Sequence, residues 1–299
     1  MGREGMKVVY GHTDSIYVQM DSVEKAEAVV EEIQTAVREH FPNVMGLEQH
    51  PVVLEFEKYY SALGVGTTKN RNAGMITWKD GQWLDEPEFI MTGFTAKRVS
   101  ETKLAKGVQT DVLKMWVNET PMEQINKYLH DKYTSVLEGD VDIESIIKRS
   151  RLKENRFKVK CTCGKKYELM GCLAIKWCIT CGVDTAKFTT LEGKRPTIGS
   201  GIAGVVHAKQ KNQTKFDDSY LYLKVRNTRE EYTNPLTKQV KEVEYVAGSR
   251  YIDFDSYTPD YQHYAEQVVK KAEPIYKAMN WHLSNIKTGK IQKSLEEWF

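Results

Sequence analysis

The cysteines of this chain constrain its fold more than any other feature. All five lie between Cys161 and Cys181, and no other part of the 299-residue sequence contains one. Thiols gathered in one short block are typical of a metal site, and disulfides are not expected in a protein that we take to be intracellular. This block is therefore predicted to hold a metal.

The spacing within the block indicates which metal it holds. Two short pairs, CxC and CxxC, are separated by 14 residues, and each is followed by glycine. This is the arrangement of a zinc ribbon, in which two knuckles close one tetrahedral site. We therefore predict Zn²⁺ bound by Cys161, Cys163, Cys178 and Cys181. Because CxC is tighter than the usual knuckle, Cys172 is an alternative ligand, and an iron–sulfur cluster is the alternative cofactor.

The remaining composition places few limits on function. Hydrophobic residues make up 40% and charged residues 28% of the sequence, which is typical of a globular chain of about two domains. No run approaches the roughly 20 apolar residues of a membrane span, and the first residues contain no signal-peptide core. We expect a cytoplasmic protein with no membrane partner. The net charge of +2 does not by itself indicate a nucleic-acid partner, so that case depends on where the charges lie.

The first third of the chain has the pattern of an α+β domain with an antiparallel sheet. Two β-rich runs, residues 7–10 and 16–18, flank a polar turn and predict a tight hairpin. Apolar residues recur at helical spacing after Ser22, and Pro42 closes that segment, which predicts a helix. Further strands are expected at residues 52–57, 59–65, 72–78 and 89–94, with a turn at Asp80-Gly81.

Helical patterns dominate the rest of the chain. Residues 100–117 are predicted to be helical, and Thr120-Pro121-Met122-Glu123 has the spacing of a capping box with proline at the first helical position. Helices are also expected at residues 202–210 and 261–279, and a strand pair at residues 220–225 and 240–246. The predicted fold class is therefore α+β, with a mainly helical second part into which the cysteine block is inserted.

The predicted hairpin carries the first functional signal. Its sequence, Tyr10-Gly11-His12-Thr13-Asp14-Ser15, closely resembles the YGDTDS hairpin of family B DNA polymerases. An arbitrary turn with Asp and Ser is common, so the assignment depends on the segments that follow. In that family the hairpin presents carboxylates to two Mg²⁺ ions, because Mg²⁺ prefers oxygen ligands and phosphoryl transfer needs a metal pair.

Further segments keep the order and approximate spacing of the same family. Residues 54–60 (LEFEKYY) are similar to the acidic strand after the hairpin, residues 69–74 (KNRNAG) resemble its KKRYAG segment, and residues 93–98 (GFTAKR) resemble the GLEIVR run that enters the thumb. Thumb landmarks are matched by residues 145–152, 207–209 and 264–274. The resemblance covers nearly all of the chain outside the cysteine block and implies part of a polymerase palm followed by a thumb.

The resemblance assigns catalytic roles residue by residue. Asp14 matches a direct metal ligand, His12 stands where the family usually has its other hairpin Asp, and Glu57 matches a third metal-proximal carboxylate better than Glu55 does. Histidine is a poor Mg²⁺ ligand, so His12 implies a weakened or retuned site without abolishing catalysis. Contacts to DNA in this region are assigned to Ser15, Lys69, Arg71 and Arg98, although Asn72 replaces the tyrosine of KKRYAG.

A dense run of positive charge precedes and enters the cysteine block. Nine Lys and Arg residues lie between Lys148 and Lys166, opposed only by Glu154. Such a run is usually a solvated face, but within a thumb it predicts sequence-independent contact with the DNA backbone. We assign this contact in particular to Lys148, Arg149 and Arg151.

Two family segments do not occur in these 299 residues: the DxxSLYPS-like segment with the other catalytic Asp, and the Kx₃NSxYG-like finger helix with a nucleotide-gripping Lys. A two-metal site without one of its carboxylates cannot hold both ions in reacting geometry. We therefore expect the small subunit of a split polymerase, which acts on primer–template DNA and dNTP only with a larger chain that supplies exonuclease, fingers and the rest of the palm.

The resulting domain plan has three parts. Residues 1–99 are expected to belong to the palm, residues 100–285 to the thumb with the zinc ribbon at 156–190, and residues 286–299 to a tail. A nucleoid-associated location follows from the expected DNA substrate. The alternative function is a non-catalytic DNA-binding and clamp-tethering subunit derived from a polymerase.

The tail carries a motif of its own. Its last eight residues, QKSLEEWF, fit the sliding-clamp pattern of a glutamine, an aliphatic residue three positions later and two aromatics at the end. One helical turn would place the apolar side chains on one face while the glutamine reaches a separate polar pocket. We expect a clamp of the PCNA type to bind Gln292, Leu295, Trp298 and Phe299.

Overall fold

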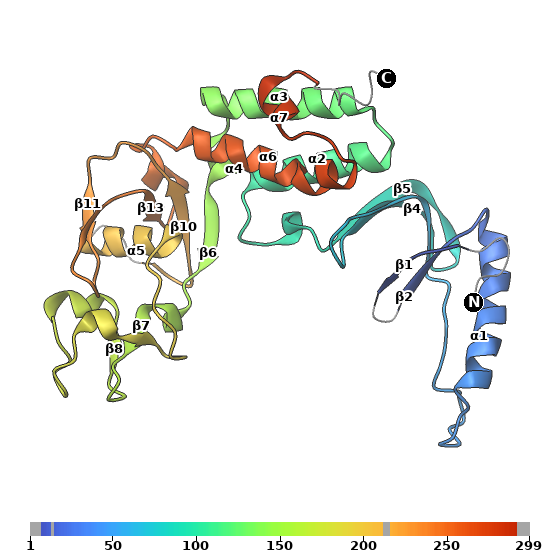
Figure 1. Cartoon of the computed structure of the whole chain (residues 1–299), viewed down its shortest axis with the longest axis horizontal. Helices are drawn as coiled ribbons and strands as arrows, with labels where there is room; N and C mark the ends of the chain where they lie inside the picture. The colour runs from blue at the N-terminus through green and yellow to red at the C-terminus, as the bar shows by residue number, and fades with distance from the viewer. Residues whose placement is uncertain (1–6, 13–14, 212–215, 292–299) are drawn as a thin grey trace. The chain divides into compact units, whose positions relative to one another are not determined.

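The computed structural model describes residues 7–12, 15–211 and 216–291 (Figure 1). Two compact units make up the chain. Unit 1 comprises Met1–Phe94, Asp111–Ile125 and Pro274–Trp281, and unit 2 comprises Thr95–Thr110, Asn126–Glu273 and His282–Phe299. The predicted α+β class with antiparallel sheets is confirmed. None of the described helices is both long and apolar enough to cross a membrane.

Unit 1 opens with a hairpin, a helix and a three-stranded sheet. Strands β1 and β2 pair antiparallel, with His12 opposite Ser15. The sheet order of the other three strands is β3-β4-β5. The bounds are β1 Lys7–His12, β2 Ser15–Gln19, α1 Val23–His40, β3 Lys58–Val65, β4 Asn72–Lys79 and β5 Gln82–Thr92.

The helix predicted after Ser22 and the turn predicted at Asp80-Gly81 are both present. Ser22 caps α1, because its hydroxyl accepts a hydrogen bond from the backbone N–H of Lys25 at 3.3 Å. Asp80 and Gly81 join β4 to β5 with φ angles of 50° and 89°. Positive φ at both central residues of a two-residue turn matches the twist of the flanking strands, and Asp-Gly adopts it at low cost.

The strand expected at residues 52–57 is wrong. Its alternation is real, because residues 52, 54 and 56 are partly buried while residues 53, 55 and 57 are exposed. The backbone nevertheless bonds to side chains of α1: the Leu54 N–H donates to Gln34 Oε1 at 2.8 Å, and Arg38 Nε donates to the Val52 carbonyl at 3.1 Å. An extended segment whose polar groups are satisfied by a helix has no need of a neighbouring strand.

The core of unit 1 lies between its sheet and residues 111–125. Gly64 on β3 approaches Trp116 so closely that a Cβ there would lie 2.3 Å from the indole ring. Only glycine therefore permits this contact. Ile76 on β4 is fully buried, and Phe56 stacks on Trp78 with ring centroids 4.3 Å apart. This packing positions both the segment that carries Glu57 and the turn between β3 and β4.

Unit 2 contains a sheet of order β13-β10-β6, with helix α5 packed against it. Gly204 lets the helix approach, because a Cβ there would lie 2.9 Å from the carbonyl carbon of Val246. The bounds are β6 Lys148–Arg151, α5 Ser200–Gln210, β10 Ser219–Lys224, β11 Glu231–Thr233, β12 Val240–Glu242 and β13 Tyr245–Gly248.

The strand pair expected at residues 220–225 and 240–246 is only partly correct. Strand β10 pairs with β13, with Tyr222 opposite Ala247. The first part of the predicted second strand forms β12 instead, which pairs with β11 in a separate ribbon. The apolar pattern runs on across residues 240–246 and does not mark the break between these two short strands.

The remaining helices include three that contribute residues to both units, namely α2, α3 and α6. The bounds are α2 Lys103–Val117, α3 Met122–Glu138, α4 Ile143–Ile146, α6 Tyr261–Ala278 and α7 Ser284–Thr288. Helix α2 starts later than residue 100 because the Thr102 hydroxyl accepts from the Ala105 N–H at 3.1 Å, as an N-cap does. Helix α3 follows Pro121 directly, as the sequence predicts.

The cysteine block forms a small three-stranded sheet of order β8-β7-β9, which we call the ribbon. Its strands are β7 Lys158–Lys160, β8 Lys166–Glu168 and β9 Thr189–Thr190. The loop before β12 anchors it: Thr185 Oγ1 donates to the Leu236 carbonyl at 2.7 Å, and Lys238 Nζ donates to the carbonyls of Pro235 and Cys172. The ribbon is therefore tied to this loop by one buried hydrogen bond from Thr185 and one part-buried hydrogen bond to the Cys172 carbonyl.

Candidate functional site

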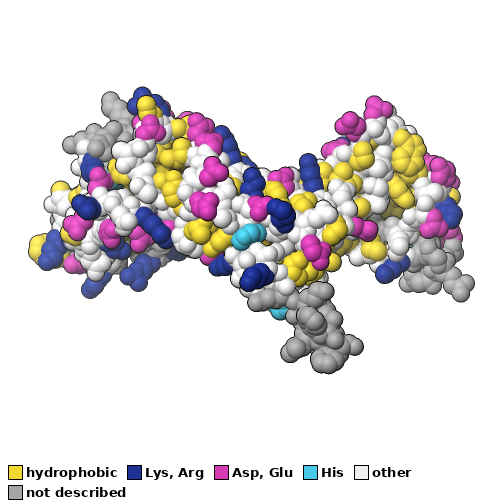
Figure 2. All heavy atoms as spheres, turned by 90° about the horizontal axis from the view of Figure 1, so that it is seen from above, with side chains coloured by type: hydrophobic (Ala, Val, Ile, Leu, Met, Phe, Trp, Pro, Cys, Tyr) yellow, Lys and Arg dark blue, Asp and Glu magenta, His cyan; other side chains and the backbone are white. Residues whose placement is uncertain are grey.

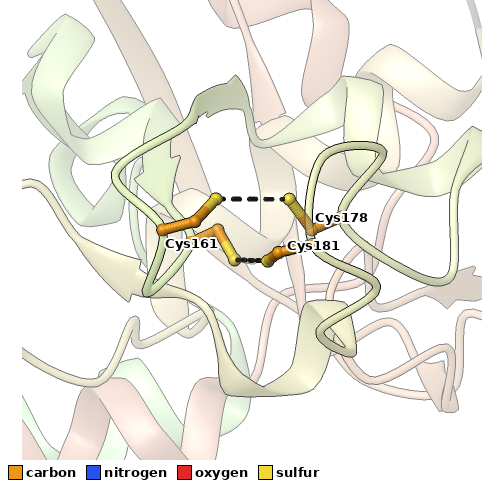
Figure 3. Close-up of side chains that lie close together, drawn as sticks. Cys161, Cys178 and Cys181 are labelled. Atoms are coloured by element: carbon orange, nitrogen blue, oxygen red, sulfur yellow. Dashed lines mark hydrogen bonds between the residues drawn. The ribbon is translucent and has the colours of Figure 1, made fainter.

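Four cysteine side chains converge at one end of the ribbon (Figure 3). The sulfurs of Cys161, Cys163, Cys178 and Cys181 all lie within 4.8 Å of one another. The Cys161–Cys181 sulfur distance is 3.3 Å, and the Cys163–Cys178 distance is 3.6 Å. A tetrahedral site with bonds of about 2.3 Å requires sulfurs about 3.8 Å apart. The arrangement is therefore close to the geometry that one Zn²⁺ needs.

Two similar turns bring these sulfurs together. In the first, the Cys161 N–H donates to the Lys165 carbonyl at 2.9 Å, and Gly164 has a φ of +90°. In the second, the Cys178 N–H donates to the Val183 carbonyl at 2.7 Å, and Gly182 has a φ of +71°. The glycine after each cysteine pair is needed because the chain must take a left-handed conformation there.

Neighbouring donors favour the thiolate form of Cys178. Its sulfur lies 3.1 Å from the Tyr167 hydroxyl and 3.4 Å from the Thr180 N–H. Desolvation raises the pKa of this thiol, but these hydrogen bonds outweigh it and lower the pKa to about 5. A thiolate is the form that binds a metal, and hydrogen bonds to the sulfur orient and stabilise it.

Cys172 differs from the other four cysteines. It is fully buried, lies outside the cluster, and burial raises its pKa to about 11. A buried neutral thiol packs as a small apolar side chain. The structure therefore favours the four-ligand set with the CxC pair over the alternative that includes Cys172.

The predicted catalytic hairpin is described except at its tip. Its two strands are antiparallel. The ring centroids of Tyr10 and Tyr17 lie 5.3 Å apart, and those of Tyr17 and Tyr60 on β3 lie 5.9 Å apart. Asp14 and Thr13 lie outside the described residues. Of the predicted residues that are described, His12 ends β1 and Ser15 begins β2.

The two candidate acids lie in the extended segment before β3. Glu55 and Glu57 are both exposed, and Glu57 contacts Lys58. Within the described part of the chain, the cysteines are the one group of three or more side chains placed to hold a metal. Glu57 is thus not part of a described group of three or more side chains that could hold a metal.

The predicted DNA-contacting residues fall in separate places. Lys69 is exposed and Arg71 half-buried in the turn between β3 and β4, where the Gly66 N–H donates to the Arg71 carbonyl at 2.8 Å. Gly93 packs against this turn, since a Cβ there would lie 1.9 Å from the Asn70 carbonyl oxygen. In unit 2, Arg98 is exposed just after a short 3₁₀ turn.

Strand β6 carries the remaining three predicted DNA-contacting residues, Lys148, Arg149 and Arg151. Its residues alternate, so Arg149 and Arg151 are exposed while Lys148 is half-buried with its ammonium 3.4 Å from a Glu101 carboxylate oxygen. Lys148 therefore has an internal partner, whereas the two arginines point to solvent from an edge strand. The tail residues Gln292, Leu295, Trp298 and Phe299 lie outside the described residues.

The comparisons with known proteins identify the family. The sequence profile described as DNA polymerase family B matches residues 2–164, which is more than half of the chain. The chain belongs to DNA polymerase family B. Among curated proteins, it is 29% identical over 143 residues to a DNA polymerase of Archaeoglobus fulgidus, and 29% identical over 145 residues to the DNA polymerase zeta catalytic subunit of Drosophila melanogaster.

These relatives are much longer than this family B chain. Each alignment covers 48% of it, but only 16% of the archaeal protein and 6% of the fly protein. Among solved structures, the family B DNA polymerase from the archaeon Pyrobaculum calidifontis matches 91% of the chain and 26% of its own, with a TM-score of 0.51 and 17% sequence identity. That likeness supports the polymerase fold over nearly the whole chain.

Two residues that support the ribbon of this family B chain carry no sequence signal of their role. Tyr167 supports the cysteine cluster, yet its role depends on the turn that brings the Ile179 N–H within 3.1 Å of its hydroxyl. Lys238 reaches the ribbon from 66 positions away. Both contacts join residues that are distant in sequence and meet only in the folded chain. No sequence pattern therefore predicts the roles of Tyr167 and Lys238.

Proposed function

We propose that this chain is the small subunit of a split family B DNA-directed DNA polymerase. The observation that carries the proposal is the family match over residues 2–164, which contains the YGHTDS hairpin. The antiparallel pairing of β1 with β2, in which His12 is opposite Ser15, is what a hairpin with Asp14 in its connection requires.

In this proposal the chain's own residues position the reacting groups. Asp14 would hold the catalytic Mg²⁺, with Glu57 as a further carboxylate and His12 at an outer position. The chemistry that a bound metal pair would supply is activation of the primer 3′-hydroxyl and neutralisation of charge on the departing pyrophosphate. The oxygen ligands of Asp14 and Glu57 suit Mg²⁺, whereas His12 does not.

The thumb contacts duplex DNA through exposed basic side chains. Arg149 and Arg151 are the strongest candidates, since both point to solvent from β6. In the proposed palm, exposed Lys69 and Arg98 and half-buried Arg71 supply further phosphate contacts. Such contacts are independent of sequence and weaken steeply with salt. On the face drawn in Figure 2, Lys and Arg side chains gather along one edge of unit 2.

Zn²⁺ in the ribbon has a structural role in this proposal. The four thiol ligands leave no open position for substrate, which is typical of structural zinc sites. The metal would hold together two turns that have little apolar core of their own. An iron–sulfur cluster is the competing occupant.

A larger chain supplies the other catalytic Asp and the finger helix, neither of which occurs in the 299 residues. The test is Mg²⁺-dependent primer extension by the two chains together. The reconstituted enzyme should extend primers, and Asp14→Ala should reduce incorporation to background, while Lys25→Ala on the exposed face of α1 serves as the control. Undiminished synthesis by the Asp14→Ala complex would refute the proposed role of the hairpin.

The tail is proposed to tether the enzyme to a ring-shaped clamp through Gln292, Leu295, Trp298 and Phe299. The support is the spacing in the sequence, which would bring three apolar side chains to one face if the segment forms a helical turn on binding. Trp298→Ala with Phe299→Ala should abolish the stimulation of long-product synthesis by a PCNA-type clamp and leave short-primer extension unchanged. Clamp stimulation that survives this double change would exclude the tail as the tether.

A further inference from the structure

The second cysteine turn of the ribbon exposes two large apolar side chains. Trp177 is 55% exposed and Ile179 is 73% exposed, directly on either side of Cys178. A solvent-exposed indole next to an exposed isoleucine is unfavourable in water unless a partner covers it. Neither side chain contributes to the cysteine cluster or to the core of the ribbon.

The backbone under Trp177 is held firmly. The Thr185 N–H donates to the Lys176 carbonyl at 3.0 Å, the Cys178 N–H donates to the Val183 carbonyl at 2.7 Å, and Trp177 forms a β-bridge with Asp184. Hydrogen bonds on both sides hold the backbone of Trp177 and so fix the direction of its Cα–Cβ bond. A rigid aromatic surface loses little conformational entropy when a ligand stacks on it.

Lysines lie on both cysteine turns, and one of them contacts Trp177. Lys176 places its ammonium 5.1 Å from the indole centroid, and Lys165 and Lys166 are exposed on the first cysteine turn. The two turns are neighbours because their sulfurs lie within 4.8 Å. Asp184, the β-bridge partner of Trp177, is the acidic residue that follows this second turn, and its carboxylate accepts the Ala186 N–H at 2.8 Å.

From this combination we infer that the ribbon binds single-stranded nucleic acid, with an unpaired base stacked on Trp177 and the adjoining phosphates held by Lys165, Lys166 and Lys176. An indole flanked by lysines is the arrangement that single strands require, because every base has an aromatic face and every nucleotide a negative charge. In a duplex the base faces are already stacked on one another and inaccessible to Trp177.

The charge of the region selects this occupant over an apolar protein surface. The two cysteine turns, residues 160–166 and 176–182, carry Lys160, Lys165, Lys166 and Lys176 and contain no Asp or Glu. A protein partner for such a surface would need a matching acidic face, whereas a nucleic-acid strand provides the negative charge throughout. The inference rests on the proposed function only in taking DNA as the partner, and it concerns a surface distinct from β6 and the hairpin.

The test compares the zinc-loaded full chain with three variants in fluorescence anisotropy, using a labelled oligo-dT of roughly 16 nucleotides and a blunt duplex of the same length. Trp177→Ala should weaken binding of oligo-dT by at least about fivefold. Trp177→Phe should keep most of the affinity, because it retains an aromatic face. Trp83→Ala is the matched control, since Trp83 is 59% exposed but lies in unit 1 on β5.

Binding of the duplex should change less than about twofold in all three variants, since paired bases cannot stack on the indole. Tryptophan emission of the wild type should be quenched by oligo-dT, and Trp177→Phe should lose most of that quenching. Equal zinc content in every variant shows that the ribbon is intact.

Two results would overturn the inference: oligo-dT affinity of Trp177→Ala within about twofold of the wild type, or an equal loss on the duplex. Either would leave the proposed polymerase role standing, because no nucleotide incorporation is measured. Conversely, a chain that fails to support synthesis can still bind oligo-dT through Trp177.

Discussion

The cysteine cluster and the polymerase hairpin differ in how far this chain assembles each site by itself. Four thiols from two turns between Cys161 and Cys181 already lie within 4.8 Å of one another. In unit 1, Glu57 is exposed in an extended segment beside Lys58 and belongs to no group of three or more described side chains placed to hold a metal. Ligands on adjacent turns come together through local folding, whereas a two-metal site gathers ligands from distant segments.

The sharpest way to break the comparison is to remove one thiol. Cys178→Ala should reduce zinc from about one per chain to near zero and unfold the ribbon, because structural zinc contributes roughly 10 to 16 kcal/mol to the folding of small metal domains. Metal analysis and amide hydrogen exchange over residues 158–190 measure both effects.

The matched control is Cys172→Ala, which should retain zinc because Cys172 lies outside the cluster. Full zinc in Cys178→Ala, or loss of zinc in Cys172→Ala, would discard the proposed ligand set. Visible absorption from iron and sulfide would instead favour the cluster alternative.

Unit 2 can be destabilised without changing the cysteines, by removing the carboxylate of a part-buried ion pair. Glu101 accepts hydrogen bonds from Lys271, whose side chain is only 8% exposed, and Lys148 lies 3.4 Å from its other oxygen. Glu101→Gln leaves Lys271 without its carboxylate and should destabilise the protein by about 3 kcal/mol at neutral pH, as measured by urea unfolding. The same change at Glu192, an exposed partner of Lys194, should have no measurable effect.

At acid pH, the wild type and Glu101→Gln should have the same free energy of unfolding. Burial raises the pKa of Glu101, but the hydrogen bond from Lys271 and the charge of Lys148 outweigh it and lower the pKa below 4.5. A carboxyl group with a lowered folded-state pKa stabilises the protein above its unfolded pKa and loses that contribution as pH falls through the folded value. If the difference in free energy of unfolding between the wild type and Glu101→Gln stayed constant from pH 7 to well below pH 4.5, the Glu101–Lys271 ion pair would be contradicted.

Within the reconstituted polymerase, the two exposed acids should behave differently. Glu57→Gln should lower single-nucleotide incorporation by at least about tenfold if its carboxylate lies beside the metal pair. Glu55→Gln makes the same charge change two residues away and should lower single-nucleotide incorporation by less than about threefold. Equal effects of the two changes would assign them to a solvated segment rather than to the metal site.

The smallest effect is expected at the hairpin itself. His12→Asp restores an oxygen ligand at an outer position and should leave the incorporation rate unchanged or raise it, because Mg²⁺ prefers carboxylate to imidazole. Steady-state incorporation at several Mg²⁺ concentrations measures this. An inactive His12→Asp enzyme would show that the histidine has a specific role in this chain.

Features of the fold that depend on local chemistry could be predicted from the sequence. Ser22 caps α1, Asp80-Gly81 turns between β4 and β5, and the cysteine pairs converge, because each needs only residues a few positions apart. The family resemblance also follows from contiguous segments, which is why the hairpin can be assigned from the sequence alone.

Features that depend on partners distant in sequence could not be predicted from the sequence. Residues 52–57 alternate as a strand does, but Gln34 and Arg38 of α1 take their hydrogen bonds. The exposure of Trp177 depends on how the second cysteine turn folds, since an indole beside a cysteine is equally compatible with a buried position. Such outcomes are decided by which surfaces meet, and no short sequence pattern encodes that.

The central claim is that this family B chain polymerises DNA only when a second chain completes its palm. The most direct measurement is single-turnover incorporation of one nucleotide into a primer–template with Mg²⁺, first by the zinc-loaded chain alone and then with the larger chain carrying the DxxSLYPS-like and finger segments. The account predicts no incorporation by the isolated chain and a rate that rises with the larger chain until the two are equimolar. Robust incorporation by the isolated chain would contradict it.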